Sequence, residues 1–346
     1  MDIVVLCGGL STERDVSISS GSGVASALRK RGHRVVLIDL FYGWTGKPGQ
    51  GKAIFERPQQ EQHWSVSEEV PDLGALRKLR AQRGSLIGPN VIEICRAADI
   101  TFLALHGEEG ENGKLQAALD LEGVRYTGSG YLGSALAMEK ELTKMALTAA
   151  GVPTPPGVTL RKGSVRDNPV GFPCVVKPCS GGSSVGVSIV QSMAEFHTAL
   201  ETAFEYENSI LVERYIAGRE FTVGLMEGKA MPVIEIIPKA GFYDYRNKYQ
   251  AGLTQEICPA QLSQEDTFRL QHLAERAMAA LMIDVYCRCD FIMDEQGEIY
   301  CLEANTLPGM TPTSLIPQMA AAQGMDYGQL CEAIIAASLR KYEKQA

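Results

Sequence analysis

The sequence has 346 residues, more than one compact domain usually contains, and it therefore predicts two or three packed units. Apolar residues make up 45% and charged residues 21%, a balance that excludes a disordered or fibrous chain and is typical of a soluble enzyme. The formal net charge of −8 argues against a dedicated nucleic-acid or anionic-membrane surface. No apolar run approaches the roughly 18 residues of a membrane-spanning helix.

The first unit, expected at residues 1–128, alternates strand-like and helix-like segments. In chain order we expect a strand at 3–7, a helix at 16–31, a strand at 35–40, a helix at 91–98, a strand at 100–106 and a helix at 114–122. Residues 41–90 are rich in Gly, Pro, Gln and Lys and have no clear periodicity before residue 73, so we treat them as a variable excursion. The alternation predicts a parallel sheet covered by helices.

The second unit is expected at residues 129–217 and the third at 218–346. For the second we predict a helix at 132–150, strands at 174–178 and 184–190 joined as a hairpin, a helix at 193–206 and a strand at 210–216. For the third we predict antiparallel strands at 221–226 and 232–238, a loop at 239–256, a helix at 264–282, a hairpin of strands at 286–293 and 299–305, and helices at 314–323 and 327–343.

Nine cysteines are scattered along the chain, without the spacing of a disulfide framework, and favour a reducing cytoplasm. Cys287 and Cys289 could form half of a metal site, but no second Cys or His pair stands at ligand spacing in the sequence. We therefore interpret both as small apolar core residues. The first residues also lack the basic region of a secretory signal.

The most specific constellation is Arg288-Cys-Asp290 on one predicted strand and Glu303-Ala-Asn305 on the next. Because residues i and i+2 share a face of a strand, pairing of the two strands would gather these four side chains. Two carboxylates and an amide oxygen suit Mg²⁺ that bridges nucleotide phosphates, with Arg288 facing charge at the reacting centre. The alternative is a solvated sheet face with a surface ion pair.

Two lysines and a glycine-rich loop point to an anionic ligand. Lys177 lies within an apolar strand, where a charge needs an anionic partner such as phosphate, and Lys140 lies on the preceding helix. The Gly/Ser loop at 180–186 would allow backbone N–H groups to close over phosphate oxygens, although a flexible turn is the alternative.

Two further segments could bind other parts of a ligand. The strand end at 213–216 could offer backbone groups to adenine, and Glu220 could reach ribose hydroxyls; an ordinary strand end is the alternative. Ser314 is a suitable N-cap for the helix that follows, and the free N–H groups there attract a carboxylate. Gly309 has no Cβ, so its N–H could approach a reacting centre.

These motifs, in this order, resemble the D-alanine–D-alanine ligase family of the ATP-grasp superfamily. The matching segments are 8–21, 105–107, 126–130, 176–186, 242–249, 288–290 and 303–310. The resemblance covers nearly the whole chain apart from about 41–90. It implies an ATP-grasp fold of mixed α/β and α+β class, with a Rossmann-like parallel-sheet domain at the N-terminus.

The resemblance implies ATP-dependent joining of two D-alanines through an acyl phosphate, as a step in peptidoglycan precursor synthesis. We expect D-alanine and ATP as small-molecule substrates, two Mg²⁺ or Mn²⁺ ions, a cytoplasmic homodimer, and no nucleic-acid or membrane partner. Two alternatives stay open. One is a related ligase whose second substrate is D-serine, D-lactate or another amino acid, although Lys248-Tyr249 matches the dipeptide-forming type. The other is a nucleotide- or amino-acid-binding protein without turnover.

The resemblance also implies roles for individual residues. Glu13 would hold the ammonium group of the first D-alanine, with Ser183 and Tyr249 completing a hydrogen-bonded set and His106 lining the same pocket. The carboxylate of the second D-alanine would contact Lys248, Ser314 and Leu315. ATP would contact Lys140, Lys177, Ser184, Glu213, Arg214, Ile216 and Glu220, although the family usually has lysine where this chain has Arg214. The metal ligands would be Asp290, Glu303 and Asn305, while Arg288 and the Gly309 amide would stabilise the oxyanion.

Overall fold

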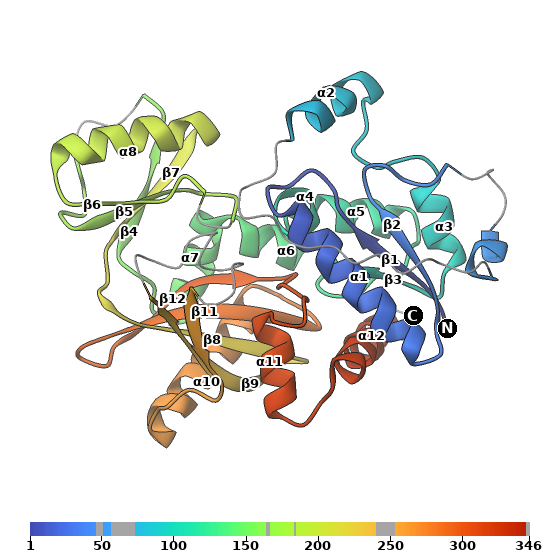
Figure 1. Cartoon of the computed structure of the whole chain (residues 1–346). Coiled ribbons are helices and arrows are strands. Elements are labelled where there is room, and N and C mark those ends of the chain that lie inside the picture. Colours follow the sequence, from blue (N-terminus) through green and yellow to red (C-terminus); the bar gives the residue numbers. More distant parts are fainter. Residues whose placement is uncertain (46–50, 57–72, 164–166, 183–184, 240–252, 344–346) are drawn as a thin grey trace.

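The computed structural model describes residues 1–45, 51–56, 73–163, 167–182, 185–239 and 253–343. The described residues form three sheets, each flanked by helices (Figure 1). Within these ranges, none of the helices combines the length and the apolar character that a membrane crossing requires.

The first sheet is parallel, as the sequence predicts. Its order is β2-β1-β3, with β1 at Asp2–Cys7, β2 at Arg34–Asp39 and β3 at Ile100–Leu103. The apolar side chains of β1 and β3 are fully buried because helices cover the sheet. The covering helices include α1 (Arg14–Lys30), α3 (Val91–Ala97), α5 (Lys114–Leu121) and, from the other end of the chain, α12 (Tyr327–Glu343).

The strand predicted at 100–106 ends early. β3 stops at Leu103, and residues 104–107 lead as a loop into the short helix α4 (Glu108–Glu111). Gly107 has a φ of +66°, which a residue with a side chain rarely adopts, so the chain turns there. His106 therefore lies on a loop beyond the end of β3 and is not part of the sheet.

The excursion at 41–90 contains two described helical pieces. These are the 3₁₀ segment η1 (Gly51–Glu56) and helix α2 (Gly74–Arg83), which stands apart at the edge of the molecule (Figure 1). None of the α2 residues is buried. The helix contacts the rest of the chain through arginines: Arg80 pairs with Glu109 at 2.8 Å, and Arg83 donates to the Phe41 carbonyl at 2.8 Å.

The helix predicted at 132–150 is wrong as a single element. The structure has two helices, α6 (Tyr131–Met138) and α7 (Lys140–Ala149), separated at Glu139, whose backbone is extended. The Lys140 N–H bonds to the Cys179 carbonyl at 2.8 Å rather than to the preceding turn. The Thr143 hydroxyl bonds to the Leu136 carbonyl at 2.7 Å, which satisfies the end of α6.

The second sheet is antiparallel and has the order β4-β7-β5-β6. It consists of β4 (Gly157–Arg161), β5 (Cys174–Pro178), β6 (Ser188–Val190) and β7 (Ser209–Arg214), with α8 (Met193–Tyr206) packed against it. The predicted hairpin of β5 and β6 is confirmed, although β6 begins later than residue 184. β4 was not predicted.

The third sheet is also antiparallel, with the order β10-β9-β8-β11-β12. Its strands are β8 (Gly218–Met226), β9 (Lys229–Pro238), β10 (Thr254–Ile257), β11 (Tyr286–Asp294) and β12 (Ile299–Asn305). Helices α10 (Gln264–Ala280) and α11 (Leu315–Ala322) flank it. The predicted loop at 239–256 therefore ends in a strand, because β10 pairs with β9.

Alternation along β11 separates an apolar face from a polar one. Cys287 and Cys289 are fully buried in the core that includes α10, whereas Arg288 and Asp290 are half-buried on the opposite face. All nine cysteines are free thiols. The interpretation of Cys287 and Cys289 as core residues is therefore confirmed.

Candidate active site

Two neighbouring cavities lie among the three sheets. Cavity A, of about 340 Å³, is lined by residues from distant parts of the chain, among them Glu13, His106, Arg288 and Ser314. Cavity B, of about 510 Å³, is bordered by strands of the second and third sheets. Four residues line both cavities: Lys140, Gly181, Gly182 and Glu303. A ligand that spans this shared wall would touch both cavities.

Glu13 stands at the N-terminus of α1 and lines cavity A. Its residue is only 9% exposed, and a Cβ on Gly107 would lie 2.7 Å from its Oε2 atom. Ser11 fixes the preceding turn because its hydroxyl donates to the His106 carbonyl at 2.5 Å. The predicted partners Ser183 and Tyr249 lie outside the described residues, as do Ser184 and Lys248.

His106 is buried, and both of its ring nitrogens have partners. Nδ1 lies 2.8 Å from the Leu307 carbonyl and Nε2 lies 2.9 Å from the Ser20 hydroxyl. Burial lowers the pKa of His106, which favours the neutral ring. The carbonyl can only accept, so Nδ1 carries the proton and Nε2 accepts from Ser20. His106 therefore connects α1 to the 307–310 segment.

Glu111 is a buried carboxylate of cavity A that the sequence pattern does not reveal. Its oxygens accept hydrogen bonds from the backbone N–H of Gly107 at 2.6 Å and of Leu307 at 3.1 Å. Burial, reinforced by the negative charge of Glu13, raises its pKa to about 7. Glu111 lies in a segment of three glutamates at 108–111, and only the fold shows that it is buried.

Glu213 lies between two lysines beside cavity B. Lys144 donates to its Oε1 at 2.6 Å, and Lys177 pairs with its other oxygen. Burial alone would raise the pKa of Glu213, but the two lysines outweigh it and hold the pKa below its ordinary value. The anionic partner predicted for Lys177 is thus, in this structure, a carboxylate.

Lys140 lies at the wall shared by the two cavities. Its Nζ donates to the Gly181 carbonyl at 2.8 Å, which places the ammonium against the glycine-rich loop. Burial lowers the pKa of Lys140, while the nearby Glu303 carboxylate opposes this shift. A cation held between a carboxylate and a loop of backbone groups is suited to an anionic ligand such as phosphate.

The residues expected at the adenine and ribose site border cavity B. Arg214, Ile216 and Glu220 line it together with apolar residues, among them Val175, Ile189, Ile292 and Leu302. Apolar walls beside an exposed strand end can accept a flat heterocycle and offer it backbone groups. The predicted segment therefore lies in a cavity of suitable chemistry.

The four residues of the predicted metal constellation lie on one face of β11 and β12. Asp290 stands opposite Glu303, and Arg288 stands opposite Asn305. Arg288 holds Asp290 through two hydrogen bonds of 2.8 Å, and the Thr222 hydroxyl donates to the same carboxylate at 2.7 Å. The prediction that these side chains gather on one patch is confirmed.

The donor set of this patch fits a hard divalent cation. Among the described residues, no group of three or more His, Cys, Asp or Glu side chains could hold a metal ion. Mg²⁺, however, commonly binds through one or two carboxylates plus substrate phosphates and water. Asp290 and Glu303, which line cavity B, supply that set together with the amide of Asn305, which lines cavity A.

Gly309 and Ser314 meet at the far side of cavity A. A Cβ on Gly309 would lie 2.9 Å from the Ser314 hydroxyl, so the absence of a side chain permits this approach. Ser314 is the N-cap residue of α11, but its hydroxyl accepts from the Thr311 N–H at 3.0 Å rather than capping the helix. The first N–H groups of α11, which begins at Leu315, thus lack a side-chain cap from Ser314.

Comparisons with known proteins agree with this arrangement. A family model described as "D-ala D-ala ligase N-terminus" matches residues 2–129, and one described as "D-ala D-ala ligase C-terminus" matches residues 146–336. A D-alanine–D-alanine ligase of Lacticaseibacillus casei is 43% identical, over 99% of this chain and 97% of its own. One of Geobacter sulfurreducens is 40% identical, over 96% of this chain and 92% of its own.

Solved structures resemble the whole chain. The D-alanine–D-alanine ligase of Bacillus anthracis complexed with ATP has a TM-score of 0.77 at 32% identity, covering 100% of this chain and 99% of that one. The VanG D-Ala:D-Ser ligase of Enterococcus faecalis has a TM-score of 0.74 at 28% identity, covering 97% and 99%. With two family models, full-length relatives and this cavity geometry in agreement, the chain belongs to the D-alanine–D-alanine ligase family, with its ATP-grasp fold.

Proposed function

We propose that this protein joins two molecules of D-alanine to D-alanyl-D-alanine with ATP, releasing ADP and phosphate, for peptidoglycan precursor synthesis. The observation that carries the proposal is the pair of cavities that share the wall of Lys140, Gly181, Gly182 and Glu303. Cavity B has the apolar borders and lysines suited to a nucleotide, and cavity A has the buried carboxylates and helix terminus suited to amino acids. Their contact allows a phosphoryl group to pass between the two ligands.

The reaction follows from the low electrophilicity of a carboxylate. An oxygen of the first D-alanine carboxylate attacks the γ-phosphorus of ATP, so that an acyl phosphate forms and ADP leaves. The amine of the second D-alanine then attacks the acyl carbon. A C–N bond forms, the C–O bond to phosphate breaks, and the amine loses a proton. The acyl phosphate hydrolyses readily, so water must be excluded while it exists.

Each proposed residue role has a physical basis in the described contacts. In cavity A, Glu13 would bind the first ammonium group, and the α11 terminus from Ser314 and Leu315 would bind the second carboxylate. Arg288 and the Gly309 N–H would stabilise the tetrahedral oxyanion. In cavity B, Lys140 and Lys177 would contact phosphates, and the strand end at 214–216 with Glu220 would contact adenine and ribose. Glu213 would also belong to the adenine site, while its ion pairs with Lys144 and Lys177 would orient Lys177.

Asp290, Glu303 and Asn305 would hold divalent cations, Mg²⁺ or Mn²⁺, whose chemistry is to offset negative charge on the phosphates.

We further propose a cytoplasmic homodimer and the three-unit division at residues 1–128, 129–217 and 218–346. Sedimentation velocity would test the dimer, since a single species at the monomer mass would exclude it.

Phosphate release tests the proposed reaction. With ATP and Mg²⁺ present, D-alanine is expected to stimulate release and to yield the dipeptide, whereas L-alanine is not. Reactions that contain D-alanine together with D-serine or D-lactate measure the selectivity for the second substrate. This selectivity distinguishes the proposed enzyme from a D-Ala:D-Ser ligase. No release with any of these amino acids, despite ATP binding, would favour a binding protein without turnover.

A further inference from the structure

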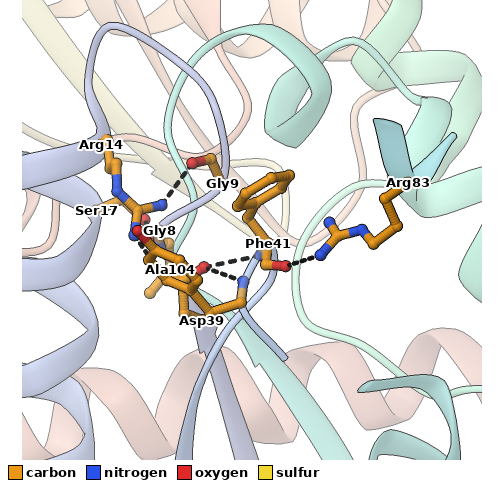
Figure 2. A network of polar contacts seen from close by, with 9 residues as sticks. Gly8, Gly9, Arg14, Ser17, Asp39, Phe41, Arg83 and Ala104 are labelled. Atoms are coloured by element: carbon orange, nitrogen blue, oxygen red, sulfur yellow. Dashed lines mark hydrogen bonds and ion pairs between the residues drawn. The ribbon is translucent and has the colours of Figure 1, made fainter. Parts of the chain in front are cut away.

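A buried ion pair outside cavity A lies directly behind the turn that carries Glu13. Arg14, the next residue after Glu13, directs its guanidinium toward Asp39 at the end of β2 (Figure 2), and Arg14 is not among the residues that line cavity A. The same guanidinium donates to the Gly9 carbonyl at 2.5 Å. The side chains of Arg14 and Asp39 are only 10% and 18% exposed. A desolvated pair of this kind contributes little net stability, so its position calls for a functional explanation.

The turn between β1 and α1 is held from both sides by this pair and its neighbours. Gly8 donates its N–H to the Ser17 hydroxyl at 2.8 Å, and that hydroxyl donates to the Ala104 carbonyl at 2.8 Å. Gly8 has a φ of +75°, and a Cβ there would lie 2.2 Å from Asp39 Oδ2. The carboxylate of Asp39 therefore packs directly against the turn.

Asp39 is itself fixed through its second oxygen. Oδ1 accepts hydrogen bonds from the N–H groups of Phe41 at 2.8 Å and Tyr42 at 3.0 Å. Arg83 of α2 then donates to the Phe41 carbonyl at 2.8 Å and lies 4.2 Å from the centroid of the Phe41 ring (Figure 2). With both carboxylate oxygens engaged, Asp39 has little freedom to move away from Arg14.

The charge of Arg14 adds a second reason for the pair. A guanidinium one residue from Glu13 would compete with a substrate ammonium group for the Glu13 carboxylate if it were free to turn. Asp39 and the Gly9 carbonyl each engage one of its two terminal nitrogens.

We propose that Arg14 and Asp39 form a positioning pair that fixes the turn carrying Glu13, and with it the place of the carboxylate that binds the ammonium group of the first D-alanine. This proposal rests on the proposed function, because the pair acts through Glu13 and the role of Glu13 is part of that function. Neither residue lines cavity A or cavity B, so both act through Glu13 and not on the substrate directly.

The test measures ADP formation against D-alanine concentration in Asp39→Asn, Glu13→Gln and the double variant. In Asp39→Asn the Glu13 carboxylate is expected to be displaced. The KM for the first D-alanine should then rise roughly 10- to 100-fold, with the KM for ATP unchanged. In the Glu13→Gln background, Asp39→Asn is expected to add no further increase, because the group through which it acts is already removed. An equal further increase would overturn the proposal.

The matched control is Glu122→Gln, which neutralises the exposed carboxylate paired with Arg96 in the same part of the chain. It is expected to leave both KM values unchanged. If Glu13→Gln leaves the KM for D-alanine unchanged, the proposed role of Glu13 fails. If Glu13→Gln raises it and Asp39→Asn does not, only the positioning pair fails.

Thermal melting separates binding from folding. Asp39→Asn is expected to keep a cooperative transition, and an altered KM in a folded variant cannot be attributed to unfolding. Should Asp39→Asn not fold, Arg14→Lys provides the same test, because lysine keeps the charge but lacks the planar guanidinium whose two terminal nitrogens bind Gly9 and Asp39 separately. An unchanged KM for D-alanine in folded Arg14→Lys would then overturn the proposal.

Discussion

Arg288 and Asp290 form a bidentate pair, with both hydrogen bonds at 2.8 Å, on the sheet face between the two cavities. Replacing Arg288 by alanine is expected to lower turnover by roughly 10²-fold or more, as for the loss of an oxyanion donor, with little change in the KM for ATP. Steady-state kinetics would measure both. Arg340→Ala is the control, since Arg340 makes an equally bidentate but exposed pair with Glu227. Unchanged turnover in Arg288→Ala would remove Arg288 from the mechanism.

Glu213 is predicted to be important for stability as well as for the position of Lys177. Glu213→Gln leaves Lys144 and Lys177 without their shared carboxylate and is expected to lower the free energy of unfolding by about 3–5 kcal/mol. Urea denaturation would measure the change. Glu122→Gln, which breaks an exposed pair, is expected to cost no more than about 1 kcal/mol. Equal costs for the two variants would contradict the role of burial.

The same carboxylate gives a pH dependence of known sign. The pKa of Glu213 is lower in the folded protein than its ordinary value of 4.5, so its stabilisation is present above pH 4.5. The stabilisation is lost as the pH falls through the pKa that Glu213 has in the folded protein. The difference in stability between the wild type and Glu213→Gln should therefore narrow in acid. A difference that is constant from pH 7 to pH 3 would argue against the ion pairs.

Glu111 predicts the opposite trend. Its pKa is raised from 4.5 to about 7, chiefly by burial, so its neutral form favours the folded state below pH 4.5 and this contribution disappears as the pH rises through about 7. Relative to Glu111→Gln, which cannot ionise, the wild type should lose up to about 3 kcal/mol of stability between pH 4.5 and pH 8. Urea midpoints across this range would measure it, and parallel curves for the two proteins would contradict it.

Gly309 and Ser314 give a prediction about packing. Gly309→Ala places a methyl group 2.9 Å from the Ser314 hydroxyl and is expected to destabilise the protein by about 1–3 kcal/mol. Ser314→Ala removes the obstructing oxygen, so the double variant should regain much of the lost melting temperature. Differential scanning calorimetry on the three variants would test this. Additive losses in the double variant would show that the contact is not the cause.

Much of the fold could be predicted from the sequence because its patterns are local. The helices at 193–206 and 327–343 and the strand at 299–305 have the bounds that periodicity assigns to them. The four residues around Asp290 could also be placed together, because one tight turn joins their two strands and alternation fixes the face.

The features that could not be predicted depend on contacts between distant segments. The sequence predicts one helix in place of α6 and α7. Nothing in residues 132–150 indicates that the N–H of Lys140 donates a hydrogen bond to the Cys179 carbonyl. The ion pair between Glu213 and Lys177 could not be predicted because it depends on strand register, which has no local signal. The burial of Glu111 has no local signal because its partner Leu307 lies 196 positions later in the chain.

The distribution of thiols has a practical consequence for spectroscopy. Eight of the nine cysteines are buried, and only Cys258 is partly accessible. Cys258 follows β10, and its sulfur lies 3.9 Å from the Gln318 carbonyl of α11. We expect a maleimide fluorophore to react at this position in the native enzyme without any engineered cysteine. Such a reporter would stand beside the helix whose first turn faces the amino-acid cavity, where its emission could follow substrate binding in real time.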